Sequence, residues 1–169
     1  SNPAGVSISN VDSSFVLICD RDNNLIRKVV LSTKTVTRVA GSGTSGASNG
    51  IGTMATFASP HLIALASDDS FAVISEWAGR RVRKLVLSTW AVTTVAGSPT
   101  SATGSADGVG TMATFGNVGG VLLTSDDLMV YVADRGNNRI RRVVLSSQRV
   151  STVVAAAGSV VLIDPVGLA

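Results

Sequence analysis

The strongest constraint on the fold of this 169-residue chain is an internal repeat. Three eight-residue segments align without gaps at intervals of 56 and 58 residues, at positions 26–33, 82–89 and 140–147. A second motif, Gly-x-Gly-Thr-Met-Ala-Thr-Phe, occupies residues 50–57 and recurs 58 residues later at 108–115. Motifs that keep one order and one spacing indicate repeated structural units, each of which packs against its neighbours.

Each unit has the pattern of β-strands. The second unit holds four short runs rich in Val, Leu, Ile and Thr, at residues 62–66, 71–75, 81–87 and 91–96, with turn residues between them. No amphipathic stretch of ten or more residues is present, which argues against a helical solenoid. Four consecutive antiparallel strands, repeated around an axis, are typical of a β-propeller blade. The sequence therefore predicts an all-β fold of three such blades.

The residues between the second and third strands of each unit resemble the signature of the NHL-repeat family. Residues 131–141 are the closest match, and residues 17–27 are the second. Residues 71–83 depart from the signature, with Glu76 in place of Asp and Gly79-Arg80 in place of the Asn pair. The resemblance implies a propeller of about six blades. It leaves the function open, because NHL propellers include protein-binding, RNA-binding and enzymatic members.

The repeat divides the chain into blades and connections. We expect blade 1 at about 3–41, a connection at 42–59, blade 2 at about 60–97, a connection at 98–116, blade 3 at about 117–155, and the start of a next blade or a closing strand at 156–169. Three blades alone would leave apolar faces and strand edges in water. We therefore expect a two-fold homodimer that closes a six-bladed ring. The alternative is that the chain is an excised half of a longer propeller.

Composition supports this interpretation and excludes several classes of protein. The chain is 45% hydrophobic and only 15% charged, against about 25% charged residues in typical soluble domains. One Cys and one His exclude an intramolecular disulfide and a multi-histidine zinc site. No run approaches the ~18 apolar residues of a membrane span. Low charge and Ser/Thr-rich loops favour an extracellular or cell-surface location, but no Asn-x-Ser/Thr sequon supports it, so the location stays open.

Three carboxylates recur at one repeat position, at Asp20, Glu76 and Asp134. They could form a ring that binds a cation, or each could pair with the arginine that follows seven residues later. We favour the structural pairing, because a catalytic pair of carboxyl groups needs two different environments. Cys19 occupies a small-residue position in the second strand and is interpreted as a buried residue rather than a nucleophile.

Most of the 14 lysines and arginines lie at or beside the third strand of each unit. Such basic residues could bind phosphate backbones, but aromatic residues are not interleaved with them, and neighbours on a strand point to opposite faces. We therefore expect arginine stems that pack between blades, and nucleic acid is the less favoured partner. The glycine-rich motif is not followed by a helix, so it does not predict a phosphate loop. Met54, Phe57, Met112 and Phe115 are expected to anchor the two connections to the core.

These observations favour a non-catalytic binding or assembly module that needs no cofactor. Its partners would be a second copy of the chain and a protein or other ligand held by the loops at 41–52 and 97–110. The predicted ligand-binding residues, in the central funnel or on the loops, are His61, Arg80, Arg81 and Arg139, and no catalytic or metal-binding residue is assigned. The alternatives are a propeller lyase or hydrolase with a divalent cation in the funnel beside His61, and an RNA-binding domain.

Overall fold

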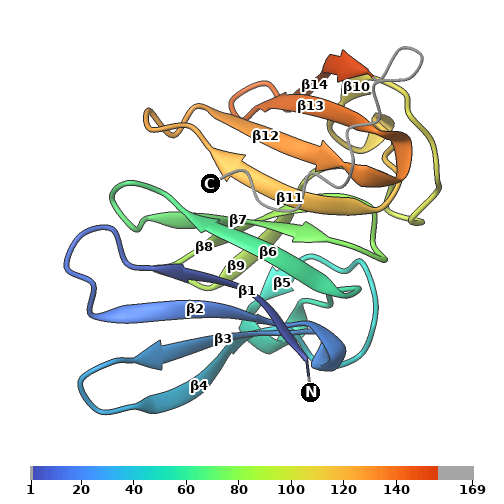
Figure 1. The fold of residues 1–169 in the computed structure, drawn as a ribbon. Helices are drawn as coiled ribbons and strands as arrows, with labels where there is room; N and C mark the ends of the chain where they lie inside the picture. Colours follow the sequence, from blue (N-terminus) through green and yellow to red (C-terminus); the bar gives the residue numbers. More distant parts are fainter. Residues whose placement is uncertain (1, 156–169) are drawn as a thin grey trace.

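The protein is described here by a computed structural model that covers residues 2–155, in which three antiparallel sheets lie side by side (Figure 1). This arrangement confirms the all-β prediction and its division into repeated four-stranded units. The first sheet, blade 1, consists of β1 (Pro3–Ile8), β2 (Phe15–Asp20), β3 (Leu25–Val30) and β4 (Thr35–Ala40). Blade 2 contains β6 (Pro60–Leu65), β7 (Phe71–Glu76), β8 (Arg81–Val86) and β9 (Ala91–Ala96). Blade 3 contains β11 (Val118–Leu123), β12 (Met129–Asp134), β13 (Arg139–Val144) and β14 (Arg149–Ala155). The segment 156–169, expected to begin a next blade, lies outside the described residues.

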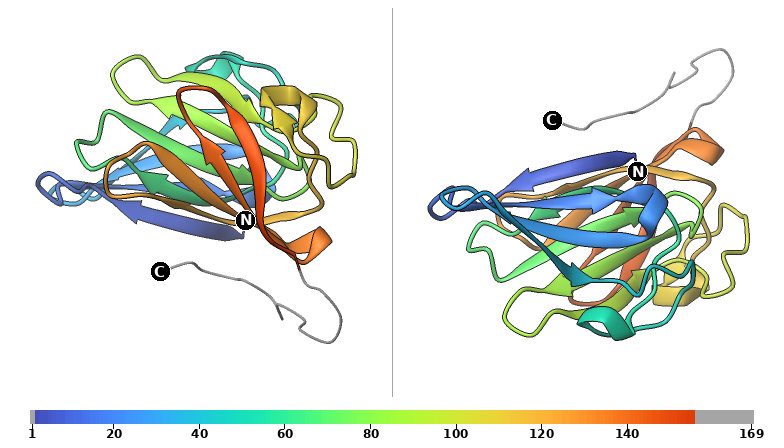
Figure 2. Two further views of the ribbon diagram at one scale, coloured as in Figure 1. Left: turned by 90° about the horizontal axis from the view of Figure 1, so that it is seen from above. Right: turned by 90° about the horizontal axis from the view of Figure 1, so that it is seen from below.

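The first strands of the three blades lie next to one another. Strand β6 packs against β1 on one side and β11 on the other, so these three strands, each at one edge of its sheet, lie in a row and are called the inner strands. The long connections and the turns between second and third strands lie at one end of the blades, and the short turns lie at the opposite end (Figure 2). Residues at the start of an inner strand therefore share one end with the connections.

Blades 2 and 3 each have a fifth strand that the sequence pattern did not predict. Strand β5 (Gly50–Ile51) pairs with β9, and β10 (Gly108–Val109) pairs with β14. Both strands belong to the connection that precedes the blade, and each adds two residues to the outer edge of that blade. A two-residue strand is too short to show alternation of apolar and polar residues. Each pairing covers an edge that would otherwise expose unpaired backbone groups.

The core consists of two layers between neighbouring blades, because each strand buries every second residue against the next sheet. In blade 1, Phe15, Leu17 and Cys19 point toward blade 2. The first layer is completed mainly by Ile26, Ala40, Phe57, Ile63, Leu65, Ile74, Leu85 and Val92. The second layer, between blades 2 and 3, includes Val73, Val82, Val95, Phe115, Val118, Val121, Val130, Val132, Val143 and Val150.

The two aromatic residues of the Gly-x-Gly motif anchor the connections, but the two methionines do not. Phe57 and Phe115 are fully buried, whereas Met54 and Met112 are 76% and 78% exposed. Each methionine ends a short 3-10 turn, at Gly52–Met54 or Gly110–Met112, that directs it into solvent. The expectation that the methionines anchor the connections was therefore wrong.

We predict that Phe57→Ala lowers the free energy of unfolding by about 3–5 kcal/mol, because it leaves a cavity between blades 1 and 2. Urea denaturation followed by circular dichroism measures this change. Met54→Ala serves as the matched control and should change the value by less than ~0.5 kcal/mol. Equal effects of the two substitutions would show that Phe57 is not an anchor.

The turn after each inner strand is held by an aspartate. Asp12, Asp68 and Asp126 each accept a hydrogen bond from the backbone N–H two residues further on. Hydrogen bonds from nearby side-chain hydroxyls, together with these backbone bonds, lower the pKa of all three carboxyl groups. The repeat thus places the same turn at the same end of all three blades.

These lowered pKa values predict a decline of stability in acid. An aspartate whose pKa is lower in the folded state stabilises the fold above its unfolded pKa of about 3.9. That contribution is lost as the pH falls through the folded value. We expect the triple variant Asp12→Asn/Asp68→Asn/Asp126→Asn to show a shallower decline of the urea midpoint below pH ~4 than the unmodified protein. Parallel profiles for the two proteins would exclude these turns as a source of acid sensitivity.

Candidate functional site

The recurrent carboxylates form buried ion pairs within their blades. Glu76 Oε1 lies 2.7 Å from Arg83 Nη1, and Glu76 Oε2 lies 2.6 Å from Arg81 Nε. Asp134 Oδ2 lies 2.9 Å from Arg141 Nη1. Burial raises the pKa of Glu76, although the two arginines act in the opposite direction. The pairing that the sequence favoured over a cation ring is therefore the one observed, and Asp20 repeats it with the arginine of blade 1.

The same arginines fasten each connection to the blade that follows it. Arg83 donates hydrogen bonds to the carbonyl oxygens of Thr56, at 3.0 Å, and Ser48, at 3.0 Å. Arg141 binds the equivalent carbonyl oxygens of Thr114 and Ala106 in the next connection, at 3.1 and 2.8 Å. One guanidinium thus joins a carboxylate of the blade to two points on the incoming chain.

We predict that Glu76→Gln lowers the free energy of unfolding by ~3 kcal/mol, because it leaves the buried Arg81 and Arg83 without a counter-charge. Chemical denaturation at neutral pH measures the loss. Asp22→Asn removes one negative charge from an exposed 3-10 turn and is the control, with an expected change below ~0.5 kcal/mol. A small effect of Glu76→Gln would mean that the arginines are held by backbone carbonyls alone.

Three predicted ligand residues bind the second connection. Arg80 Nη1 donates to the Ser101 carbonyl at 3.1 Å, and Arg139 Nη1 donates to the Ser105 carbonyl at 3.0 Å. Arg81 is buried and also donates to the carbonyl of Pro99. Basic residues beside the third strand are therefore engaged within the protein, as expected for stems packed between blades. A role of these three arginines in ligand binding stays a prediction.

The fourth predicted ligand residue, His61, lies near the start of the inner strand β6. Its Nδ1 lies 2.7 Å from the carbonyl oxygen of Gly119 in β11, so the ring bridges the inner strands of two blades. The ring centroid is 5.4 Å from that of Trp77, which opens the turn between β7 and β8. The ring of His61 thus stands at the end of the inner strands where the turns between second and third strands converge.

Three residues at one repeat position meet beside His61. Arg21, Trp77 and Arg135 each directly follow a second strand, in blades 1, 2 and 3 respectively. The Cζ atoms of Arg21 and Arg135 lie 5.8 and 5.0 Å from the centroid of the indole ring. We call these four residues, Arg21, His61, Trp77 and Arg135, the mouth cluster. Three of them share one repeat position, a signal that could have predicted the cluster, but the sequence analysis missed it because Trp77 differs in chemistry from the arginines of the other two units.

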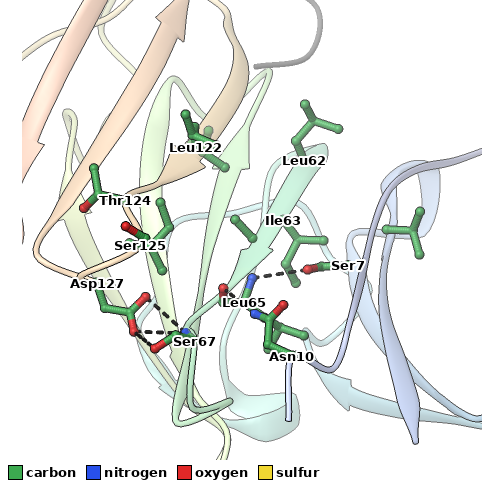
Figure 3. Close-up of a pocket in the computed structure, with 14 residues that line it drawn as sticks. Ser7, Asn10, Leu62, Ile63, Leu65, Ser67, Leu122, Thr124, Ser125 and Asp127 are labelled. Atoms are coloured by element: carbon green, nitrogen blue, oxygen red, sulfur yellow. Dashed lines mark hydrogen bonds between the residues drawn. The ribbon is translucent and has the colours of Figure 1, made fainter. Parts of the chain in front are cut away.

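A groove runs along the other half of the inner strands (Figure 3). It encloses about 670 Å³ and is lined by residues of β1, β6, β11 and the turns that follow them. Leu62, Ile63 and Leu122 are among the apolar residues on its wall. On its rim, Ser67 Oγ donates to Asp127 at 2.6 Å, which ties blade 2 to blade 3. The groove offers an apolar surface, while the mouth cluster offers cationic and aromatic groups.

Other candidate chemistry is limited in residues 2–155. Cys19 is fully buried, and burial raises the pKa of its thiol, which keeps it protonated. The described residues contain no group of three or more His, Cys, Asp or Glu side chains arranged to hold a metal ion. None of the helical turns in that part of the chain has the length and apolar character needed to span a membrane.

Comparison with known proteins identifies the fold. No protein-family model matches the chain, and no curated protein matches it. An auxiliary nutrient binding protein from Bacteroides thetaiotaomicron superposes with a TM-score of 0.70 at 16% identity, over 90% of this chain and 36% of that one. An auxiliary nutrient binding protein from Bacteroides ovatus gives a TM-score of 0.68 at 14% identity, over 89% of this chain and 35% of that one. A chain of a nidogen/laminin complex gives a TM-score of 0.65 at 13% identity, over 90% of this chain and 48% of that one. The chain therefore shares the fold of proteins of which it spans about a third to a half.

Proposed function

We propose that the chain is a non-catalytic binding module of the NHL type that holds an anionic ligand at the mouth cluster. The observation that carries this proposal is the convergence of Arg21 and Arg135 on the ring of Trp77, with His61 beside it. The fold similarity to proteins described as auxiliary nutrient binding proteins supports a binding role.

The chemistry of the cluster favours an anion over a neutral ligand. A guanidinium that stacks on an indole is held by cation–π attraction, while its N–H donors lie in its own plane. A carboxylate or phosphate can accept two of these donors at once. Arg21 is half-buried and Arg135 is exposed. The net charge of +3 adds a weak long-range attraction for anions.

The state of the buried acidic residues supports a role without catalysis. A lyase or hydrolase needs a general acid and a general base within reach of its substrate. Glu76 and Asp134 are instead fully buried in ion pairs with arginines that fasten the connections. The remaining features of the mouth are two cations, an indole and an imidazole, which suit recognition of charge.

Citrate, a tricarboxylate, is a suitable probe, and Trp77 provides the signal. In a Trp90→Phe background, we expect citrate at low salt to cause a saturable change of indole fluorescence. Arg21→Gln/Arg135→Gln should weaken the affinity at least about tenfold, because each charge-assisted hydrogen bond contributes roughly 1.5–3 kcal/mol.

The control variant removes two exposed arginines outside the cluster, Arg38→Gln/Arg149→Gln. It should bind citrate with nearly unchanged affinity. If both double variants bind citrate equally weakly, the loss of affinity reflects only the overall charge of the protein. The absence of a saturable fluorescence change would refute the anion site.

A further inference from the structure

The repeat allows each exposed residue of blade 1 to be compared with its buried counterparts in blades 2 and 3. Val36, Val92 and Val150 occupy one position of the outer strand and are 55%, 1% and 2% exposed. The same contrast holds on the inner strand, where Val6 is 64% exposed but Ile63 and Val121 are 6% and 7% exposed. Blade 1 therefore presents to solvent a surface that the other two blades bury.

This surface, the leading face of blade 1, extends across all four strands. It consists of Val6, Ile8, Val16, Ile18, Val29 and Val36. In blades 2 and 3 the corresponding residues pack against the preceding blade. Six aliphatic side chains at blade-contact positions form one apolar patch, and a patch of this kind marks a protein contact.

The outer edge of blade 1 shows the same difference. Strands β9 and β14 are covered by β5 and β10, whereas β4 has no such partner among residues 2–155. Arg27 pairs with Asp20 as Arg83 and Arg141 pair with their carboxylates, but its side chain is 34% exposed and theirs are 0% exposed. Blade 1 thus retains the residues of a blade junction, but no segment among the described residues covers them as β5 and β10 do in blades 2 and 3.

Blade 3 presents the complementary surface, its trailing face. Val39, Val95 and Val153 are equivalent and are 8%, 3% and 49% exposed. Leu122 and Tyr131 also lie on this face, where blade 2 has Ala64 and Val73 packed against its successor. The trailing faces of blades 1 and 2 cover the leading faces of blades 2 and 3. The trailing face of blade 3 is therefore the kind of surface that fits the leading face of blade 1.

We propose that the leading face of blade 1 binds the trailing face of blade 3 from a second copy of the chain. Two copies related by a two-fold axis form this junction twice, which closes a ring of six blades. The junction repeats the two blade contacts already present within one chain. This inference concerns assembly and does not depend on a ligand at the mouth cluster.

One polar contact distinguishes the junction between copies from those within a chain. Asp69 and Asp127 occupy a left-handed turn position and accept hydrogen bonds from the preceding blade, Asp127 from the N–H and hydroxyl of Ser67. In blade 1 this turn position, two residues before the second strand, belongs to Ser13. The counterpart of Ser67 in blade 3 is Ser125. The junction between copies therefore lacks a carboxylate, and we expect it to be the weakest in the ring.

Multi-angle light scattering at high micromolar concentration tests the proposal. The unmodified chain should give about twice 17.2 kDa. Val6→Asp/Val36→Asp and Leu122→Asp/Val153→Asp should each give a monomer with unchanged far-ultraviolet circular dichroism, because these residues are exposed in the single chain. The control Met54→Asp/Met112→Asp, which lies outside both faces, should remain a dimer.

Mixing the two monomeric variants determines the orientation of the junction. A head-to-tail contact leaves one intact junction in the mixed pair, so the mixture should recover mass near that of a dimer. A dimer built from two leading faces would not be recovered. Ser13→Asp should shift dimerisation to lower concentration by supplying the missing carboxylate. A monomeric unmodified chain, or dimers that survive both sets of face substitutions, would overturn the proposal.

Discussion

The buried pairing of a carboxylate on the second strand with an arginine on the third is the interaction on which the rest of the structure depends. In blade 2 it involves Glu76 and Arg83, and in blade 3 Asp134 and Arg141. A lone buried charge is costly, so each pair requires further hydrogen bonds to be stable. Backbone carbonyls of the incoming connection supply them. The same guanidinium group lies over the buried phenylalanine of that connection, Arg83 over Phe57 and Arg141 over Phe115, so the ion pair, the connection and the aromatic ring share one arginine.

Much of this arrangement could be read from the sequence, because the repeat reports on it three times. Alternating residues predicted the strands, and the recurrence of a carboxylate in every unit correctly favoured a structural role. The fifth strands escaped detection since β5 and β10 are two residues long and include glycine. Met54 and Phe57 are both apolar residues of one motif, but Met54 ends a 3-10 turn and is exposed, whereas Phe57, three residues later, is buried.

The mouth cluster, in contrast, is a site that the sequence did not predict. Its residues are 16 to 114 positions apart in the sequence and come from all three blades, and Arg21, Trp77 and Arg135 share only their place in the repeat. A residue that departs from a structural signature is easily taken for a loss of pattern. At this position the departure inserts an indole between two guanidinium groups. In a repeat protein, positions that keep their place but change their chemistry are therefore informative about binding, whereas invariant positions report on folding.

The fifth strands also change what counts as one unit of this protein. Since β5 and Phe57 belong to the chain that enters blade 2, the piece that carries its own edge cover runs from about residue 42 to 97, not from 60 to 97. The following piece runs from about 98 to 155. The natural module is thus a connection with the blade after it, and exchange or duplication of material between propellers of this kind should respect that boundary. A cut placed directly before an inner strand would separate a blade from the connection that carries its fifth strand and its buried phenylalanine.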